Sequence, residues 1–536
     1  MDTTQPSSTN PSATSHEKPP EDEVEYPSGM RFGVIVVALC LSIFLTSLDG
    51  TIIAVAIPKI TDKFHSLDDI GWYGSAYFLG TAAFQLFFGR LYSFLSVKWV
   101  YIAALTIFEI GSLVCGVAPS SNALIAGRVI AGVANAGVLT GTLVIIADSM
   151  PLDKRPFFTG LLGGIYGISA VSGPLLGGVL TDKISWRWCF YINLPLTGAV
   201  IAVIVFLFKE SRVRQIEEMS VRRRVEKLDP WGTLIFIPAM VCLLLALQWG
   251  GSLYAWKNAR IIVLFILFGI LGAAFIGIQI WKQEDATVPP RIMKRRSIIA
   301  GSAFIFCLGG SFYTMTYFLP IYFQAIKGVS AVRSGIDNIP MVLALSLSAP
   351  LTGLFVSRVG YYKPPMFISV IFMSVGAGLI STLTAETSSG RWIGYQILYG
   401  VGSGCGVQQS LMAAQTTLEA KDIPTGTALM MFMQILGGTV FVSVAQTVFQ
   451  NRLITGLAAR VPGVDPRTVF NAGATSLRSP ASGVPPDLLP AVLEVYRDAL
   501  QGVYFVVAAL SALAVVGAVA AEWRSVRGEN VAGVVA

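Results

Sequence analysis

Charge is the scarcest property of this 536-residue sequence. Only 13% of its residues are Asp, Glu, Lys or Arg, against about 25% in soluble globular proteins, whereas 54% are hydrophobic. The mean hydropathy is +0.67. These values exclude a soluble domain and indicate an integral membrane protein. The net charge of +7 agrees with the excess of Lys and Arg in cytoplasmic loops of membrane proteins, so we expect no nucleic-acid partner.

Histidine is almost absent, because the chain contains only His16 and His65. A histidine-based metal site or a Ser-His-Asp catalytic set inside the membrane is therefore excluded, and we expect neither a bound metal nor an enzymatic activity. The six cysteines have no C-x-x-C spacing, which argues against a zinc site or a disulfide framework. The pattern G-x-x-x-x-G-K-[ST] is missing too, so we expect no nucleotide cofactor.

Long apolar runs, in contrast, fill most of the chain. A helix needs about 20 apolar residues to cross the hydrocarbon core of a bilayer, and continuous runs favour helices over the alternating strands of a barrel. We therefore predict an all-α polytopic membrane protein with fourteen transmembrane helices. The predicted spans 1 to 14 lie at roughly 32–57, 71–93, 97–118, 121–147, 157–181, 188–208, 230–250, 260–281, 298–324, 335–357, 364–385, 391–413, 424–449 and 499–521.

Lys and Arg are distributed unevenly between the two sides of this topology. With the N-terminus in the cytoplasm, the cytoplasmic tails and loops hold 23 of these residues and the outside loops hold 14. Because basic residues concentrate on the cytoplasmic side, we predict that both termini are cytoplasmic. The most basic segment, 209–229, then lies in the cytoplasm, where contact with anionic lipid head groups is the favoured interpretation and a protein partner the alternative.

Two pairs of similar segments indicate an internal duplication. GRLYSFLSVK (89–98) at the end of span 2 resembles GLFVSRVGYYK (353–363) at the end of span 10, and RVIAGVANAG (128–137) in span 4 resembles QILYGVGSGCG (396–406) in span 12. The same offset of eight spans predicts two six-helix repeats, spans 1–6 and 9–14, with two inserted helices between them. Six-span repeats around a central cavity are typical of transporters.

The predicted domain organisation follows from these spans. It has a disordered N-tail, two six-helix bundles, two inserted helices and two cytoplasmic linkers. The segments are the cytoplasmic N-tail (1–30), the N-terminal bundle (31–208), the basic linker (209–229), the inserted helices (230–281), the second linker (282–297), the C-terminal bundle (298–521, with an outside loop at 450–498) and the cytoplasmic C-tail (522–536).

Three charged side chains lie well inside predicted spans: Asp49 in span 1, Glu109 in span 3 and Arg128 in span 4. Each costs roughly 2.5–3.5 kcal/mol at the centre of a membrane helix, so such residues face the bundle interior and are candidates for function. One interpretation is an ion pair that only joins helices. The other is a proton-coupling site, because a carboxylate whose distance from an Arg changes can take up and release a proton. We predict proton coupling.

The sequence GLLGGIYGISAVSGPLLGGVL (160–180) in span 5 contains seven glycines and a proline. Small residues let membrane helices pack closely, and a proline inside a helix removes one backbone hydrogen bond and kinks the helix. The segment is therefore either an ordinary packing surface or a hinge. We predict a hinge, formed by Gly173, Pro174, Gly177 and Gly178.

The remaining candidates for a ligand site are uncharged. Gln, Asn and Tyr side chains in or at the ends of spans would suit a cavity for a large, weakly polar ligand, although each could instead form a hydrogen bond between helices. Gln408 and Gln409 are among these polar positions. The residues that we predict for the substrate cavity are Gln85, Asn135, Tyr313, Gln324 and Gln396.

Together these motifs resemble the major facilitator superfamily, in particular its drug:proton antiporters with fourteen spans. LDGTIIAVAIP (48–58) is similar to the span 1 motif of that family, LIAGRVIAGVANAG (124–137) to its span 4 motif and SGPLLGG (172–178) to its antiporter motif in span 5. WRWCFYINLP (186–195) and YFLPIYFQAIKGVSAVRSGI (317–336) resemble the fungal branch, in which many members export toxins or other secondary metabolites.

The segment GRLYSFLSVKW (89–99) is similar to the loop 2–3 signature of the family, but Ser93 stands where an acidic residue is usual. The resemblance implies a gate in this loop, in which Asp148 at the end of span 4 could replace the missing acid by facing Arg90 or Lys98. The predicted gate residues are Gly89, Arg90, Ser93, Lys98 and Asp148.

The resemblance covers residues 32 to about 521. It implies alternating access, in which proton entry drives the export of an amphipathic small molecule such as a drug, a mycotoxin or another secondary metabolite. It also implies a multi-pass monomer in the plasma membrane, whose partners are the substrate, protons and the lipid bilayer. Two alternatives remain: a siderophore-type uptake permease, and a transporter-like sensor that binds a ligand without moving it.

Overall fold

A computed structural model describes residues 29–66, 69–210, 223, 226–251, 253–466, 468–469, 477–478 and 483–527. The predicted N-tail, most of the basic linker 209–229 and the end of the C-tail lie outside these residues. Every regular element within them is a helix, apart from two isolated backbone bridges. The predicted all-α class is therefore confirmed.

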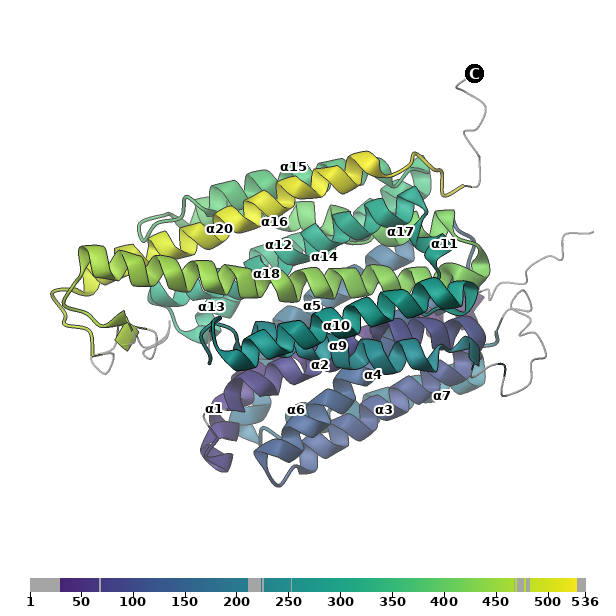
Figure 1. The fold of residues 1–536 in the computed structure, drawn as a ribbon, viewed down its shortest axis with the longest axis horizontal. Helices are drawn as coiled ribbons and strands as arrows, with labels where there is room; N and C mark the ends of the chain where they lie inside the picture. The colour runs from purple at the N-terminus through teal and green to yellow at the C-terminus, as the bar shows by residue number, and fades with distance from the viewer. Residues whose placement is uncertain are drawn as a thin grey trace, which may run out of the picture.

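The first part of the chain forms one helical bundle, drawn in purple and blue in Figure 1. Two of its helices, α6 and α7, follow each other directly and together form one apolar span, Trp188–Leu207. The helices are α1 (Gly29–Phe64), α2 (Ile70–Phe94), α3 (Val97–Val117), α4 (Ser121–Ser149), α5 (Arg155–Lys183), α6 (Trp188–Tyr191) and α7 (Asn193–Leu207).

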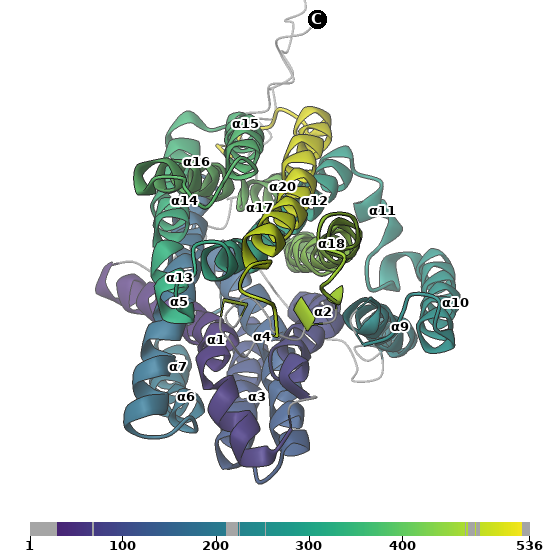
Figure 2. The same cartoon turned by 90° about the vertical axis from the view of Figure 1, so that its left-hand side faces the viewer.

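Two helices separate this first bundle from the second. α9 (Pro230–Trp249) and α10 (Ala259–Lys282) pack against each other, and α9 also contacts α2 and α18. The pair therefore lies beside the junction of the two bundles, as Figure 2 shows. The second bundle contains α11 (Pro290–Met293), α12 (Arg296–Ala325), α13 (Ala331–Asp337), α14 (Ile339–Val359), α15 (Lys363–Ile380), α16 (Ser389–Gly406), α17 (Gln409–Thr417), α18 (Ile423–Arg460) and α20 (Leu489–Ala520).

Twelve helical segments within the described residues are long and apolar enough to cross a membrane. The helices α2 and α16 coincide with two further predicted spans but are not among the twelve. Their sequences are rich in Gly, Ser and Tyr, which lowers their hydropathy. Both nevertheless lie within the bundles, since α2 packs along α4, and α16 packs along α14 and α15.

The helices run along the long axis and define two ends of the molecule (Figure 1). We call the end with the start of α1 and the end of α20 the tail end, and the opposite end the loop end. At the loop end, α18 continues to Arg460 and α20 begins at Leu489, so the connection between them is shorter than the predicted loop 450–498. The two extensions hold each other, because Arg460 Nη1 binds Asp498 Oδ2 at 2.6 Å.

The two bundles repeat the same local contacts at the segments that resemble each other in sequence. Lys98 at the start of α3 donates to carbonyls at the end of α7, and Lys363 at the start of α15 donates to carbonyls at the end of α20. Arg128 on α4 and Gln396 on α16 each donate to a backbone carbonyl of a neighbouring helix, at 2.9 Å in both cases. Gln396 is therefore the neutral counterpart of Arg128.

The two bundles pack tightly against each other at the tail end. Gly160 of α5 lies against the carbonyl of Ala349 on α14, and Gly353 of α14 lies against the carbonyl of Pro156 on α5. A side chain at either glycine would collide with the backbone of the other bundle. Glycine at these two positions therefore permits the close approach of α5 and α14.

Candidate functional site

A buried ion pair joins two of the residues predicted for proton coupling. Asp49 on α1 accepts a hydrogen bond from Nη1 of Arg128 on α4. Their side chains are 1% and 0% exposed. Arg128 lies near the start of α4, so the pair sits toward the loop end of the first bundle.

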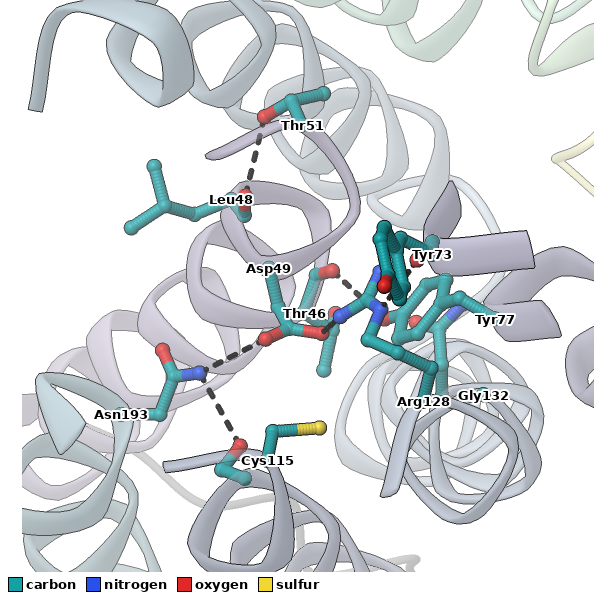
Figure 3. Close-up of polar contacts among 12 residues, drawn as sticks. Thr46, Leu48, Asp49, Thr51, Tyr73, Tyr77, Cys115, Arg128, Gly132 and Asn193 are labelled. Atoms are coloured by element: carbon teal, nitrogen blue, oxygen red, sulfur yellow. Dashed lines mark hydrogen bonds and ion pairs between the residues drawn. The ribbon is translucent and has the colours of Figure 1, made fainter. Parts of the chain in front are cut away.

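Further side chains hold the pair in place. Figure 3 shows Asn193 and Arg128 approaching Asp49 from opposite sides. Asn193 Nδ2, at the start of α7, lies 3.2 Å from Asp49 Oδ1 and 3.2 Å from a serine hydroxyl on α3. Arg128 Nε donates to the carbonyl of Tyr73 at 2.9 Å, and the guanidinium lies 4.5 Å from the centre of the Tyr77 ring. Five helices of the first bundle therefore meet at this pair.

Neither charge of the pair is exposed to solvent. Taking both charges out of water is costly, and their mutual attraction offsets that cost only while both are present. Arg128 Nη2 already has no hydrogen-bond partner among the described residues. A proton on Asp49 would remove the counter-charge of Arg128 and leave the buried guanidinium unpaired.

The third residue predicted for proton coupling, Glu109, lies elsewhere. It is half-buried on α3, and a Cβ at Gly198 on α7 would lie 3.7 Å from its Oε1. The structure therefore places Glu109 at the seam between α3 and α7 and does not bring it to the ion pair of Asp49 and Arg128.

A cavity of about 120 Å³ lies between the two bundles. The first bundle lines it with α1, α2, α4 and α5, and the second with α12, α14, α18 and the junction of α16 and α17. No described lining residue is charged. Among all residues that the structure describes, no cluster of His, Cys, Asp or Glu could hold a metal ion. The polar lining residues are Thr46, Ser47, Thr51, Tyr77, Thr81, Asn135, Tyr166, Tyr313, Gln408 and Gln434.

The residues predicted for the cavity lie in several places. Asn135 and Tyr313 line it. Gln85 instead donates to a threonine hydroxyl on α4 at 2.6 Å, and Gln396 donates to a backbone carbonyl at the end of α13. Gln324 lies in the last turn of α12 at the loop end. These three side chains are not among the residues that line the cavity.

Sequence reasoning did not single out Tyr77, Tyr166 or Gln434, which also line the cavity. One signal was available for Tyr166, which lies three residues after Gly163 and so shares its helix face. A large ring in a stripe of glycines needs free space in front of it. Gln434 carried the same signal as the chosen candidates, because it is an amide in the apolar run 424–449.

Tyr77 separates the ion pair from the cavity. Its ring lies over the Arg128 guanidinium on one side, and its hydroxyl donates to the carbonyl of Thr46 at 2.7 Å. Tyr77 and Thr46 both line the cavity, whereas Asp49 and Arg128 do not. One aromatic side chain thus stands between the uncharged cavity and the charged pair.

The span 5 motif packs on α1 within the first bundle. Gly173 and Gly177 lie directly against α1, and a Cβ at Gly178 would lie 3.8 Å from the same helix. α5 stays helical through Pro174. Toward the tail end, the same helix packs on α14 of the second bundle. α5 therefore connects the helix that carries Asp49 to the interface between the bundles.

Three of the predicted gate residues lie at the tail-end junction. Arg90 Nη2 donates to the carbonyl of Lys227 at 2.6 Å. Ser93 Oγ lies 3.1 Å from Thr425 Oγ1 on α18, and Gly89 packs against the same helix. Ser93 thus forms a neutral hydrogen bond between the bundles at the position where the family usually has an acid.

The other two predicted gate residues have different surroundings. Lys98 binds carbonyls at the end of α7 and does so within the first bundle. Asp148 is half-buried in the last turn of α4, at the same end of the molecule.

The buried carboxylate of Asp229 forms hydrogen bonds that join the two linkers beside the inserted helices. Asp229, which is fully buried before α9, accepts from Thr287 N and Oγ1 at 3.0 and 2.7 Å and from Gln279 at 3.0 Å, and it pairs with Lys282 at 3.0 Å. Burial alone would raise the pKa of Asp229, but the hydrogen bonds from Thr287 and Gln279 outweigh burial and hold that pKa below its usual value.

The same linkers reach both bundles. The backbone carbonyl of Lys227 accepts a hydrogen bond from Arg90 of the first bundle. Arg291 donates two hydrogen bonds, at 2.6 and 2.8 Å, to the carboxylate of Asp422, which lies just before α18 of the second bundle. We name Lys227, Asp229, Thr287 and Arg291 the linker clasp. It joins α2 to α18 at the tail end.

Two helical bundles around an uncharged cavity, with a buried ion pair beside it, define a membrane transporter. The family model of the Major Facilitator Superfamily matches residues 39–442, and the chain belongs to that superfamily. The resemblance noted in the sequence is therefore confirmed.

Similar proteins agree with this assignment. The chain is 52% identical over 510 residues to the "MFS-type efflux pump MFS1" of Arthroderma benhamiae, which covers 95% of each chain. It is 48% identical over 501 residues to the "Efflux pump aflT" of Aspergillus parasiticus, covering 93% of this chain and 97% of the relative. The solved structure of the proton:xylose symporter XylE has a TM-score of 0.55 at 14% identity, covering 90% of this chain and 94% of the symporter. That likeness concerns the fold alone.

Proposed function

We propose that this chain is a proton-coupled antiporter that exports an amphipathic small molecule, such as a drug, a mycotoxin or another secondary metabolite, by alternating access. The observation that carries the proposal is the buried pair of Asp49 and Arg128 beside a cavity between two bundles. Relatives that match nearly the whole chain are named efflux pumps, which supports export as the direction.

The proposed cycle starts with a proton on Asp49. Protonation releases Arg128 from its counter-charge, and the guanidinium then shifts against the Tyr77 ring at the cavity wall. Because α5 packs on α1 through Gly173 and on α14 through Gly160, a shift of α1 reaches the interface between the bundles. The tail end opens, the substrate enters from that side, and loss of the proton restores the closed arrangement.

The proton gradient suffices for this work. One proton that crosses about 100 mV supplies roughly 2.3 kcal/mol, and one pH unit adds about 1.4 kcal/mol. Together they hold a concentration gradient of a few hundredfold for a neutral solute. Exchange of one proton for one molecule is therefore an adequate drive for export.

The proposed topology has fourteen crossings, with α2 and α16 added to the twelve apolar spans. Their low hydropathy suits helices that are enclosed by other helices of their bundle. The excess of Lys and Arg at the tail end supports a cytoplasmic position for that end and for both termini. The arrangement closed at the tail end is then the outward-facing state of a monomer in the plasma membrane.

The test uses yeast that lacks its own drug pumps. Cells express wild type or Asp49→Asn at matched surface levels, with and without a protonophore, and accumulation of a panel of fluorescent and toxic compounds is measured. We expect wild type to lower accumulation of at least one compound, and both Asp49→Asn and the protonophore to abolish that effect. Asp182→Asn is the matched control, because Asp182 is an exposed carboxylate that pairs with Lys59.

Three outcomes would contradict parts of the proposal. Export by Asp49→Asn at the wild-type level would make the ion pair purely structural. Higher accumulation in wild-type cells would indicate an uptake permease of the siderophore type. Binding of a compound without any change in accumulation would indicate a transporter-like sensor.

A further inference from the structure

Gln408 lies at the cavity wall, where one helix of the second bundle is followed directly by the next. α16 ends at Gly406 and α17 begins at Gln409, and the two residues between them, Val407 and Gln408, both line the cavity. Both residues keep right-handed helical dihedral angles, so the backbone stays helical through this junction.

The Gln408 side chain reaches from this junction to the other bundle. A Cβ at Gly163 on α5 would lie only 2.9 Å from Gln408 Nε2, so the glycine leaves the space that the amide occupies. Gln408 Oε1 is buried and has no hydrogen-bond partner among the described residues. An acceptor left in this state is costly, and a ligand that donates a hydrogen bond removes the cost.

The rest of the cavity lacks any counter-charge. Its described lining residues are apolar, aromatic, hydroxyl or amide side chains, and Tyr77 lies between the cavity and the nearest charged pair. A ligand with a permanent charge would lose its hydration on entry and gain no opposite charge. The cavity therefore disfavours ions of either sign.

From these observations we infer that Gln408 is a specificity-determining residue, and that the substrates are uncharged molecules with a hydroxyl or amide N–H group that donates to Gln408 Oε1. The apolar part of such a molecule packs against the aliphatic and aromatic wall formed by residues such as Ile43, Leu139 and Phe312. This inference rests on the proposed function only in taking the cavity as the substrate site.

The test compares three probes with the same aromatic body: naphthylethanol, which is neutral and donates a hydrogen bond; its methyl ether, which is neutral and donates none; and naphthylethyl-trimethylammonium, a permanent cation. Equilibrium binding of each tritiated probe is measured on the purified full chain in lipid nanodiscs without a proton gradient. We expect wild type to bind the alcohol about five- to tenfold more tightly than the ether, the range that one neutral hydrogen bond gives, and the cation most weakly.

Three variants locate the preference. Gln408→Leu should bind alcohol and ether equally. Gln408→Glu places a charge in the cavity wall and should raise binding of the cation relative to the alcohol. Gln409→Leu is the matched control, because Gln409 is the next residue and is buried but does not line the cavity, and it should keep the wild-type preference.

The inference is overturned if wild type binds none of the probes, binds alcohol and ether equally, or binds the cation best. It is also overturned if Gln408→Leu keeps the preference for the alcohol, or if Gln409→Leu loses it. The proposed function is tested separately, by flux of the alcohol from proteoliposomes under an imposed pH gradient. Selective binding without proton-driven flux would contradict the antiporter and leave the role of Gln408 in place.

Discussion

The ion pair of Asp49 and Arg128 allows a prediction that separates its structural role from its functional one. Asp49→Asn keeps the shape of the side chain but leaves the fully buried Arg128 without a counter-charge. Removing one partner of a buried ion pair destabilises a protein by about 3–5 kcal/mol. The double variant Asp49→Asn/Arg128→Gln removes both charges, and its Gln at position 128 copies Gln396 of the second bundle, which makes the equivalent backbone hydrogen bond. We therefore expect the double variant to be more stable than Asp49→Asn alone.

The assay needs both a stability and a transport measurement. The free energy of unfolding is measured by denaturant titration in mixed micelles, for wild type, the two single variants and the double variant, so that the cycle gives the coupling energy between Asp49 and Arg128. Transport is measured in the same variants. The double variant should recover stability but not proton-driven export. Additive effects of the two substitutions, or an Asp49→Asn variant within about 1 kcal/mol of wild type, would refute the reasoning.

Three further predictions concern the tail end. Gly160→Leu introduces a side chain against the carbonyl of Ala349 and should prevent closure of the tail end and abolish export. Thiol labelling of a cysteine introduced at the tail end measures closure, and it should become faster in this variant. An unchanged labelling rate would contradict the prediction. Arg291→Gln removes the double hydrogen bond to Asp422 and should lower the apparent melting temperature by less than Asp49→Asn does, because Arg291 is partly exposed; an equal or larger decrease would contradict this. Asp229→Asn should destabilise the protein at pH 7, and the difference from wild type should vanish as pH falls below about 4. The pKa of Asp229 is lower in the folded protein, so its stabilisation is present above the unfolded pKa and is lost on acidification; a difference that persists at low pH would exclude this account.

Most of the long helices could be predicted closely, because apolar runs mark them in the sequence, although α2 and α16 are less apolar than the twelve other segments. The predicted span 121–147 corresponds to α4, Ser121–Ser149. Hydropathy could not find the ends of α18 and α20, which continue past the apolar runs. Those extensions depend on contacts between the two helices, such as the ion pair of Arg460 and Asp498, and no single segment of sequence encodes such a contact.

The candidate site could be predicted in part for a similar reason. Charges inside a membrane are so costly that Asp49 and Arg128 were expected to face the bundle interior, and the structure brings them together. Glu109 obeys the same rule in sequence but lies at a helix seam, since only packing decides which way a side chain on α3 points. The position of Gln408 at the cavity wall could not be predicted, because its segment is a run of glycines and small residues with no feature that marks a ligand contact.

The two bundles share local contacts but differ in charge, and this difference suggests how proton and substrate are kept apart. The first bundle holds Asp49 and Arg128, whereas the second has neutral Gln396 at the position equivalent to Arg128 and offers Gln408 to the cavity. Tyr77 is one direct link between the proposed proton site and the proposed selective contact, because its ring lies over Arg128 and the residue lines the cavity. If this arrangement couples the two sites, Tyr77→Leu should leave binding of a neutral probe largely intact in nanodiscs and uncouple its export from the pH gradient.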